Sequence, residues 1–335
     1  MAVTAKTIET YDNSVIREDL QEAYNMISPE EVPFSTMCGS RSVTQWQFDW
    51  PVVELAAPDP ANRVVEGDSD VDNDDGTLAD RLWNFCQISD KVVEVSQTSQ
   101  AVDAAAYNIQ RLMQQRTLKM KEMKRDIEVM LLSNVAADAG SSGNARTTAG
   151  LPAFLKTNAD ITAGAVAPTL SGTTEGYPDT GWTDATATRV FDEDTLNAVI
   201  EACWNQGAEP SVIMLNGGNK RRLSATFTGN STRYKDAIDQ RLVASIDFYE
   251  SDFGELTVVP NRFQPTLNAA TDDDNYAVYI LDPEYVRVAD LDPVQSKPLA
   301  ETGHSIRELI WREYGLQVDN EKAHGIIPDT DNTVS

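Results

Sequence analysis

Two strand-like runs separated by a long acidic stretch constrain the fold of this chain more than any other feature. The first run places large apolar residues at alternate positions: Trp46, Phe48, Trp50 and Val52. That spacing is the period of a half-buried strand, and a second strand-like run covers residues 83–98. Between them, residues 54–80 carry nine acidic side chains, one basic side chain (Arg63) and little that could form a core.

The two runs are expected to pair as a long hairpin. An isolated two-stranded hairpin is only marginally stable in water. The aromatic face of this hairpin must therefore pack on another surface, and the rest of the chain and a neighbouring copy are the two candidates.

The longest helical signal follows directly, over residues 103–134. Its apolar residues recur at spacings of three and four, with Arg116 in the same stripe: Ile109, Met113, Met120, Met123, Ile127 and Met130. Asp103 is the expected N-cap, and Gly140 lies just beyond the end. At about 1.5 Å per residue the helix would span roughly 48 Å, the length of a structural spine or a coiled coil. Ordinary core packing is the simplest interpretation of its methionines.

Composition excludes several classes of function. The chain has 53 acidic and 27 basic residues, a formal charge of −26, and such a surface repels phosphate backbones. Acidity of this kind also keeps a protein soluble. The first residues lack the apolar segment of a signal peptide and no run is long enough to cross a bilayer, so we expect folding in a cytoplasm. The three distant cysteines predict buried free thiols.

The remaining segments divide into an arm, a connection and a mixed region. Residues 1–45 are expected to form an arm that needs a surface to lie on, with a helix over 14–25. Residues 135–190 are rich in Ala, Gly, Ser and Thr around one apolar patch at 150–155, and predict a surface connection. From residue 191 an α+β region is expected. Its predicted helices are 192–206 and 219–227, and its strands are 211–215, 256–260, 276–281, 285–289 and 305–318, the last with a helix as alternative.

The sequence offers no motif for catalysis. Its two histidines, His304 and His324, accompany no G-x-S-x-G nucleophile elbow. The turn at 216–219 lacks the Lys and Ser/Thr of a phosphate-binding loop. Scattered carboxylates leave a hydrolase as a third class of function, but abundance alone is a weak signal. We therefore predict no enzyme activity, no catalytic residue and no cofactor.

The acidic run at 68–76 suggests calcium but does not match an EF-hand. Counted from Asp70, the sixth position should be Gly and the twelfth Glu. These positions hold Asp75 and Arg81. A solvated acidic loop is the preferred interpretation, with a looser cation site as the alternative, and no metal ligand is assigned.

Three stretches, in their order along the chain, resemble a known family: QISDKVVEVS at 87–96, KRDIEVMLL at 124–132 and AGLPAF at 149–154. They resemble the SU10-like major head proteins, a group within the HK97-like capsid proteins of tailed bacteriophages. The segment order, with an arm, a long hairpin, a long helix, a mixed domain and late strands, is similar to that of the same fold. The resemblance covers most of the chain.

The resemblance implies an α+β fold of the HK97-like capsid type. Its parts would be an N-terminal arm (1–45), an E-loop hairpin (46–98), a P-domain (99–156) with a spine helix (103–134), a surface connection (157–190), an A-domain (191–290) and C-terminal strands returning to both domains (291–335).

The function implied is that of a major capsid protein. Copies would assemble into hexamers and pentamers and close into an icosahedral shell around double-stranded DNA, in a virion assembled in the bacterial host cytoplasm. The hairpin begins near residue 46, which leaves no room for a built-in scaffolding segment, so a separate scaffolding protein is an expected partner. A portal is another, and a cement protein is a further candidate. DNA would be touched only non-specifically, and no membrane is involved. The alternative is an acidic decoration protein that coats a lattice it does not form.

Candidate contacts between subunits lie on the hairpin and on the long helix. We hypothesise that the acidic segment 68–75 of one subunit lies near the basic stretch 111–125 of its neighbour. Each exposed pair contributes only about 0–1 kcal/mol, but a shell repeats it many times. The candidates are Trp46, Phe48, Trp50, Arg63, Asp68, Asp70, Asp72, Asp74, Asp75, Arg111, Arg116, Lys119, Lys121, Lys124 and Arg125.

Overall fold

The computed structural model describes most of the chain. The described ranges are 28–63, 66–67, 76–101, 111–183, 188–226, 247–267, 275–301 and 303–331. The predicted helix over 14–25, the predicted N-cap Asp103 and the acidic segment 68–75 lie outside these ranges.

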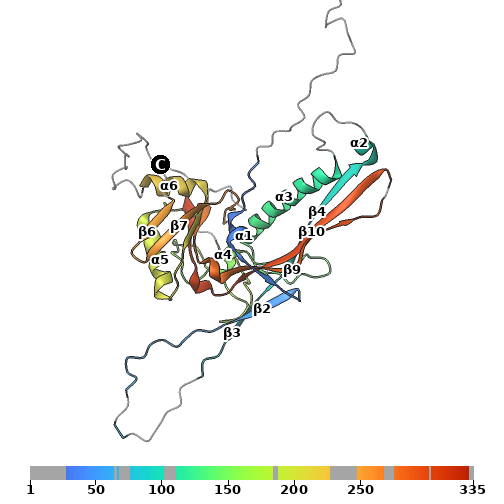
Figure 1. Ribbon diagram of the computed structural model, residues 1–335. Coiled ribbons are helices and arrows are strands. Elements are labelled where there is room, and N and C mark those ends of the chain that lie inside the picture. Colours follow the sequence, from blue (N-terminus) through green and yellow to red (C-terminus); the bar gives the residue numbers. More distant parts are fainter. Residues whose placement is uncertain are drawn as a thin grey trace, which may run out of the picture.

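A first sheet forms a long, extended part of the molecule (Figure 1). Its strands are, in spatial order, β1 (Gly39–Ser42), β9 (Val286–Pro298), β10 (Ser305–Val318) and β4 (Gln87–Ser96). β10 pairs antiparallel with both β4 and β9, whereas β1 pairs parallel with β9. The strand predicted over 305–318 is therefore confirmed, and the helix that was its alternative is excluded.

Helix α3 (Leu112–Leu132) lies along one face of this sheet (Figure 1). Its fully buried side chains are Met123, Ile127, Glu128, Leu131 and Leu132. An ion pair of 2.5 Å between Lys91 on β4 and Asp126 fixes the helix to the sheet. The predicted helix is thus confirmed over 112–132, about 32 Å at 1.5 Å per residue. It ends two residues earlier than predicted, and residues 102–110 lie outside the described ranges.

Three short elements flank these parts. Helix α1 (Pro33–Met37) precedes β1, α2 (Gln97–Ala101) follows β4, and α4 (Leu151–Phe154) carries the apolar patch predicted at 150–155. All four residues of α4 are buried. The apolar run therefore belongs to the core that α3 shares with the first sheet.

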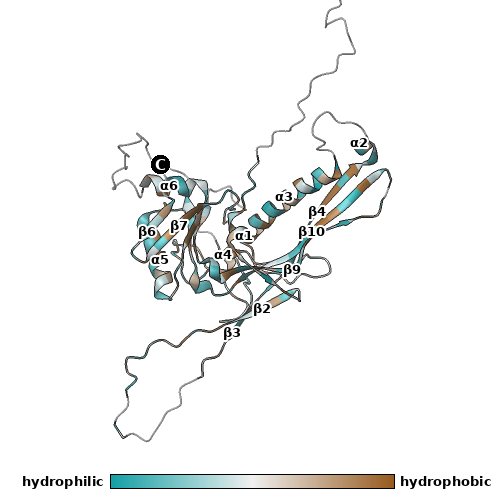
Figure 2. Ribbon diagram, viewed as in Figure 1, coloured by the Kyte–Doolittle hydropathy of each residue, from teal (hydrophilic) through white to brown (hydrophobic). Residues whose placement is uncertain are grey.

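A second sheet of five strands forms the other large unit. Its spatial order is β11 (Gly325–Asp331), β8 (Asn275–Leu281), β5 (Val212–Leu215), β7 (Gly254–Pro260) and β6 (Phe248–Ser251). Helices α5 (Glu193–Asn205) and α6 (Gly217–Thr226) accompany it, and two 3-10 turns, η2 (Pro283–Tyr285) and η3 (Glu321–Ala323), lie beside its strands. Figure 2 shows hydrophobic residues concentrated on its inner strands and more hydrophilic residues on α5.

Local signals explain most of this unit. Asp192 is the N-cap of α5, because its carboxylate accepts a hydrogen bond of 2.9 Å from the Thr195 amide. The α5 face with Leu196, Val199, Ile200 and Cys203 is buried, as its spacing predicts. The predicted strands at 211–215, 256–260 and 276–281 are confirmed with shifts of one or two residues. β9 is longer than the predicted 285–289, and β1, β6 and β11 were not predicted.

The predicted hairpin is present but is built differently at its second arm. β2 (Gln47–Val52) pairs antiparallel with β3 (Asp80–Phe85), and β4 then begins at Gln87. The single run predicted over 83–98 is therefore two strands, divided at Cys86. The Cys86 amide donates to the Trp46 carbonyl at 2.7 Å, next to the last β2–β3 pair, whereas pairing with β10 begins at Gln87.

The connection at 157–190 is irregular, as predicted, but part of it is not a surface segment. Trp182 is buried and its backbone is held by the Asn134 side chain, which accepts from its amide at 2.7 Å and donates to its carbonyl at 2.8 Å. Isolated bridges join this stretch to β3 and β11. The sequence did not predict these contacts, because the segment contains few apolar residues.

Candidate assembly surfaces

The inner aromatic face of the β2–β3 hairpin packs within its own subunit. Phe48 and Trp50 are 3% and 4% exposed. Their rings stack at 5.9 Å between centroids, and Trp50 lies 6.2 Å from the ring of Phe154 on α4. Gly315 on β10 makes the approach possible, because a Cβ there would lie 2.5 Å from the Phe48 ring. The prediction that Phe48 and Trp50 contact another subunit is therefore wrong, because the core of this chain already buries both side chains.

Trp46 has a different environment from the other two aromatic candidates. It is 40% exposed, its ring stacks on Phe85 at 5.5 Å, and the Arg146 guanidinium lies 5.7 Å from its centroid. Arg146 is in turn paired with Glu313 on β10 at 2.5 Å. Trp46 therefore packs on Phe85 and Arg146 while part of its surface remains open to a partner.

The described parts of the β2–β3 connection expose apolar side chains. Val53, Leu55 and Leu78 are 57%, 89% and 86% exposed, and the connection extends away from the rest of the subunit (Figure 1). Arg63 is also exposed. Asp68, Asp70, Asp72, Asp74 and Asp75 lie outside the described residues. An extended loop with solvent-exposed leucine side chains is typical of a segment that binds another surface.

The basic stretch on α3 is partly committed to its own subunit. Arg116 pairs with Glu308 at 3.3 Å, Lys119 with Glu122 at 2.7 Å and Lys121 with Glu30 at 2.7 Å. The Arg125 guanidinium lies 5.4 Å from the centre of the Phe263 ring.

Two further basic side chains of this stretch, Arg111 and Lys124, are exposed. These two are the most exposed of the six basic candidates.

The face of the first sheet opposite α3 also carries exposed apolar residues. Ile88 and Val92 on β4 are 55% and 41% exposed. Val92 pairs across the ladder with Leu309, and Asp90 pairs with Trp311. Sequence periodicity alone predicts one buried face for β4, and the structure shows which face α3 covers.

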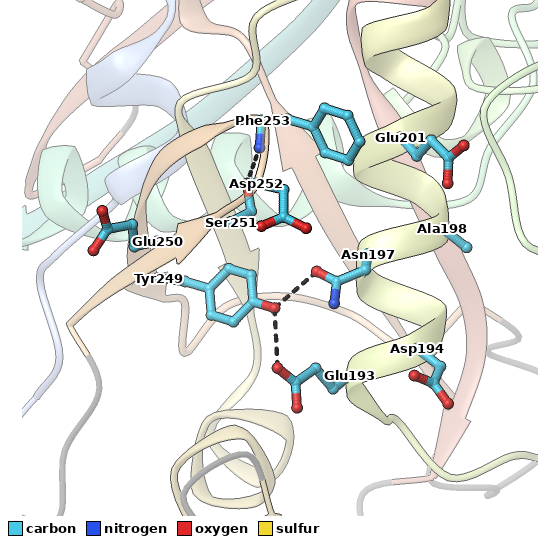
Figure 3. Close-up of a pocket in the computed structure, with 10 residues that line it drawn as sticks. All are labelled: Glu193, Asp194, Asn197, Ala198, Glu201, Tyr249, Glu250, Ser251, Asp252 and Phe253. Atoms are coloured by element: carbon cyan, nitrogen blue, oxygen red, sulfur yellow. Dashed lines mark hydrogen bonds between the residues drawn. The ribbon is translucent and has the colours of Figure 1, made fainter. Parts of the chain in front are cut away.

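An acidic groove lies between α5 and the β6–β7 hairpin (Figure 3). Five carboxylates line it: Glu193, Asp194, Glu201, Glu250 and Asp252. The Tyr249 hydroxyl lies 2.8 Å from Asn197 Oδ1 and 3.4 Å from Glu193. Burial, together with the Glu193 charge, raises the pKa of Tyr249. At one end, the rings of Trp204 and Phe253 lie 5.3 Å apart.

Metal-ligating side chains do not cluster among the described residues. Within those ranges, no group of three or more His, Cys, Asp or Glu side chains is placed to hold a metal ion. His324 is buried, and its Nδ1 accepts a hydrogen bond of 3.2 Å from the Asp282 amide. His324 is thus part of the core and does not face a cleft. Among the described helices, none combines the length and apolar composition needed to cross a bilayer.

Sequence reasoning missed the most deeply buried acid of α3. Glu128 is fully buried, and its carboxylate accepts hydrogen bonds from α1 and from the residue after β7. The available signal was its position: Glu128 is the only acid in the apolar run Ile127–Leu132. An isolated acid within such a run is a candidate for a buried, hydrogen-bonded group.

The comparisons with known proteins agree with this architecture. A model of the SU10 major capsid protein family matches residues 3–331. The chain belongs to that family. The major capsid protein of Escherichia phage Phieco32 is 27% identical over an alignment of 357 positions, which covers 95% of this chain and 95% of that protein. The resemblance seen in the three sequence stretches is confirmed. They lie on β4, in the second half of α3 and at α4.

Solved structures show the same fold at low identity. The capsid of a native GTA particle has a TM-score of 0.59 at 14% identity, over 96% of this chain and 97% of that chain. The capsid of Cyanophage P-SCSP1u has a TM-score of 0.57 at 11% identity, over 98% and 97%. The predicted α+β, HK97-like capsid fold is confirmed. As a member of the SU10 family, the chain is a lattice-forming major capsid protein of a virion, and the decoration-protein alternative has no support.

Proposed function

We propose that copies of this SU10 major capsid protein form hexamers and pentamers and close into an icosahedral shell around double-stranded DNA. The observation that carries the proposal is the β2–β3 connection. Leu55 and Leu78 are almost fully exposed on a segment that extends away from its own core. Burying them on a neighbour would contribute about 1.5–3 kcal/mol each, and a closed lattice provides that neighbour for every copy.

The neighbouring surface is proposed to combine apolar and charged contacts. The exposed face of β4 with Ile88 and Val92 offers apolar area, and the partly exposed Trp46 offers an aromatic anchor. Arg111 at the N-cap of α3 and Lys124 on the helix are the cations that the acidic segment 68–75 of another copy would meet. Because each exposed pair is weak, the apolar contacts supply the affinity and the charges set the register.

The proposed partners follow from the same role. A separate scaffolding protein would guide the curvature of the shell, a portal would occupy one vertex, and a cement protein is a further candidate. Assembly is proposed to take place in the host cytoplasm, without a membrane and without catalysis by this chain. A net charge of −26 would keep packaged DNA mobile at the inner wall, because like charges repel.

Negative-stain electron microscopy tests the proposal directly. The purified chain, alone and co-expressed with its neighbouring genes, should give rings of five and six or closed shells. The double variant Leu55→Asp with Leu78→Asp should stay soluble and folded but unassembled. The matched control is Val166→Asp with Val190→Asp, two exposed valines outside the β2–β3 connection. A purely monomeric wild-type chain under both conditions would contradict the function, and normal shells from the leucine variant would contradict the contact.

A further inference from the structure

Glu128 of α3 is a buried carboxylate held by uncharged donors. It is fully buried, and within the described ranges its carboxylate forms no ion pair. Its Oε1 accepts from the Phe34 amide and from Asn261 Nδ2, both at 2.8 Å, and its Oε2 accepts from the Ser35 amide at 2.8 Å. Three donors on one carboxylate satisfy a charge that would otherwise be costly to bury.

These donors come from two separate parts of the molecule. Phe34 and Ser35 belong to α1, at the point where the N-terminal arm joins the first sheet. Asn261 directly follows β7 of the second sheet, where its amide donates to the Leu215 carbonyl of β5 at 2.8 Å. Helix α3 itself lies on the first sheet. One carboxylate therefore connects the arm, the long helix and the second sheet.

Other contacts of α3 reach the same part of the second unit but do not reach the arm. Arg125 lies over the Phe263 ring at 5.4 Å, and Asn134 donates to the Leu267 carbonyl at 2.9 Å. Arg125 in the second half of α3 and Asn134, two residues after its end, thus hold the segment 261–267. Within the described residues, only Glu128 among these three side chains also bonds α1.

A buried charge is an expensive way to fill this position. A well-packed apolar residue of similar volume is often as stable or more stable than a buried ion, whereas removing one partner of a buried charge is strongly destabilising. We propose that Glu128 is a coupling residue: its carboxylate ties the position of α1 to the position of the second sheet. A displacement of the second sheet then weakens the two hydrogen bonds by which Glu128 holds α1.

The test uses amide hydrogen exchange on the full-length, unassembled subunit, so it does not depend on the proposed hexamers and pentamers. Asn261→Ala removes the donor from the second sheet and touches neither Phe34 nor Ser35. If the carboxylate couples the two parts, exchange at the Phe34 and Ser35 amides should accelerate about tenfold, because the remaining bonds lose their fixed acceptor. Gln264→Ala is the control, since Gln264 is buried in the same segment but bonds the Ala277 carbonyl.

Two outcomes overturn the proposal. Unchanged exchange at Phe34 and Ser35 in Asn261→Ala would mean that Glu128 only caps α1. Equal acceleration in Gln264→Ala would mean that general loosening of the segment is the cause. Should Asn261→Ala fail to fold, Glu128→Gln is the second variant. Its single oxygen can keep the Phe34 and Asn261 bonds while its NH₂ group faces the Ser35 amide, so exchange should accelerate at Ser35 more than at Phe34, and equal rates would contradict the geometry.

Discussion

At the scale of single residues, burial decides which reactive groups of this chain can react. Burial raises the pKa of the Cys86 and Cys203 thiols to about 12, so both stay protonated at neutral pH and are inert. The predicted buried free thiols are confirmed for these two, whereas Cys38 is only partly buried. Burial also lowers the pKa of His324 to about 4, which keeps this imidazole neutral.

The lowered pKa of His324 predicts that the folded chain loses stability in weak acid. Its pKa is about 4 in the folded chain and 6.5 as the ordinary value, so the unfolded chain binds the extra proton between these limits. The contribution of His324 to the free energy of unfolding is therefore fully present above pH 6.5. It is lost as the pH falls toward 4, and the loss is about 3 kcal/mol in total. His324→Asn, whose Oδ1 takes the place of Nδ1, should flatten this part of the pH profile in urea unfolding of the subunit.

The exposed His304 provides the control for this measurement. His304→Asn should retain the slope of the wild-type chain, and both variants retain Asp282, whose pKa is raised mainly by burial. Identical slopes for wild type and His324→Asn between pH 6.5 and 4 would show that His324 is not the group that titrates.

At the scale of elements, local signals were sufficient where an element contains its own pattern. Helix α5 has a capping Asp192 and a clear apolar stripe, and β2 has alternating aromatic residues, so both were predictable. β1 reads Gly-Ser-Arg-Ser and has no apolar period, yet it is a strand because it pairs with residues 287–290 of β9. β11 contains a proline and a register shift. Their partners, and not their own residues, define these strands.

The hairpin β2–β3 depends on one buried amide. Asn84 is fully buried; its Nδ2 donates to the Leu316 carbonyl at 2.7 Å and to Thr148 Oγ1 at 3.0 Å, and its Oδ1 accepts from the Phe85 and Ala149 amides. Asn84→Asp has the same shape but loses both donors and places a charge against a carbonyl. It should lower the free energy of unfolding by about 3–5 kcal/mol.

Urea unfolding of the unassembled subunit measures this effect. Asn62→Asp is the matched control, because Asn62 is exposed and the change in net charge is the same. A loss below about 1 kcal/mol for Asn84→Asp, the value of an ordinary hydrogen bond, would mean that the amide does not hold the hairpin to β10.

At the scale of the whole molecule, α3 is the common support of both sheets. It pairs with β10 through Arg116 and with β4 through Asp126. Arg125 and Glu128 on the helix, and Asn134 just after it, hold the segment after β7. The segment order was readable from the sequence. The sequence did not show which hairpin residues pack in the subunit's own core and which stay open to a neighbour. Phe48 and Trp46 have the same periodic signal, but only Phe48 packs against Gly315.

Charge is the second property of the whole molecule that bears on assembly. Twelve different basic side chains of the described residues are already in ion pairs within the subunit. The net charge of −26 already counts all 27 basic residues, so subunits should repel one another at low salt. Two effects then compete: general repulsion, which any acid-to-base change relieves, and specific docking of residues 68–75, which only those acids can make.

Two triple variants with equal charge separate these effects. Asp72, Asp74 and Asp75 changed to Lys, or Asp194, Glu201 and Asp252 of the acidic groove changed to Lys, each move the net charge from −26 to −20, since every change adds two charges. If docking at the basic stretch matters, the first variant should raise the critical concentration for assembly several-fold, while the second should lower it. Light scattering at low and high salt measures both. Equal behaviour of the two variants would leave repulsion as the only electrostatic effect, because position would then carry no information beyond net charge.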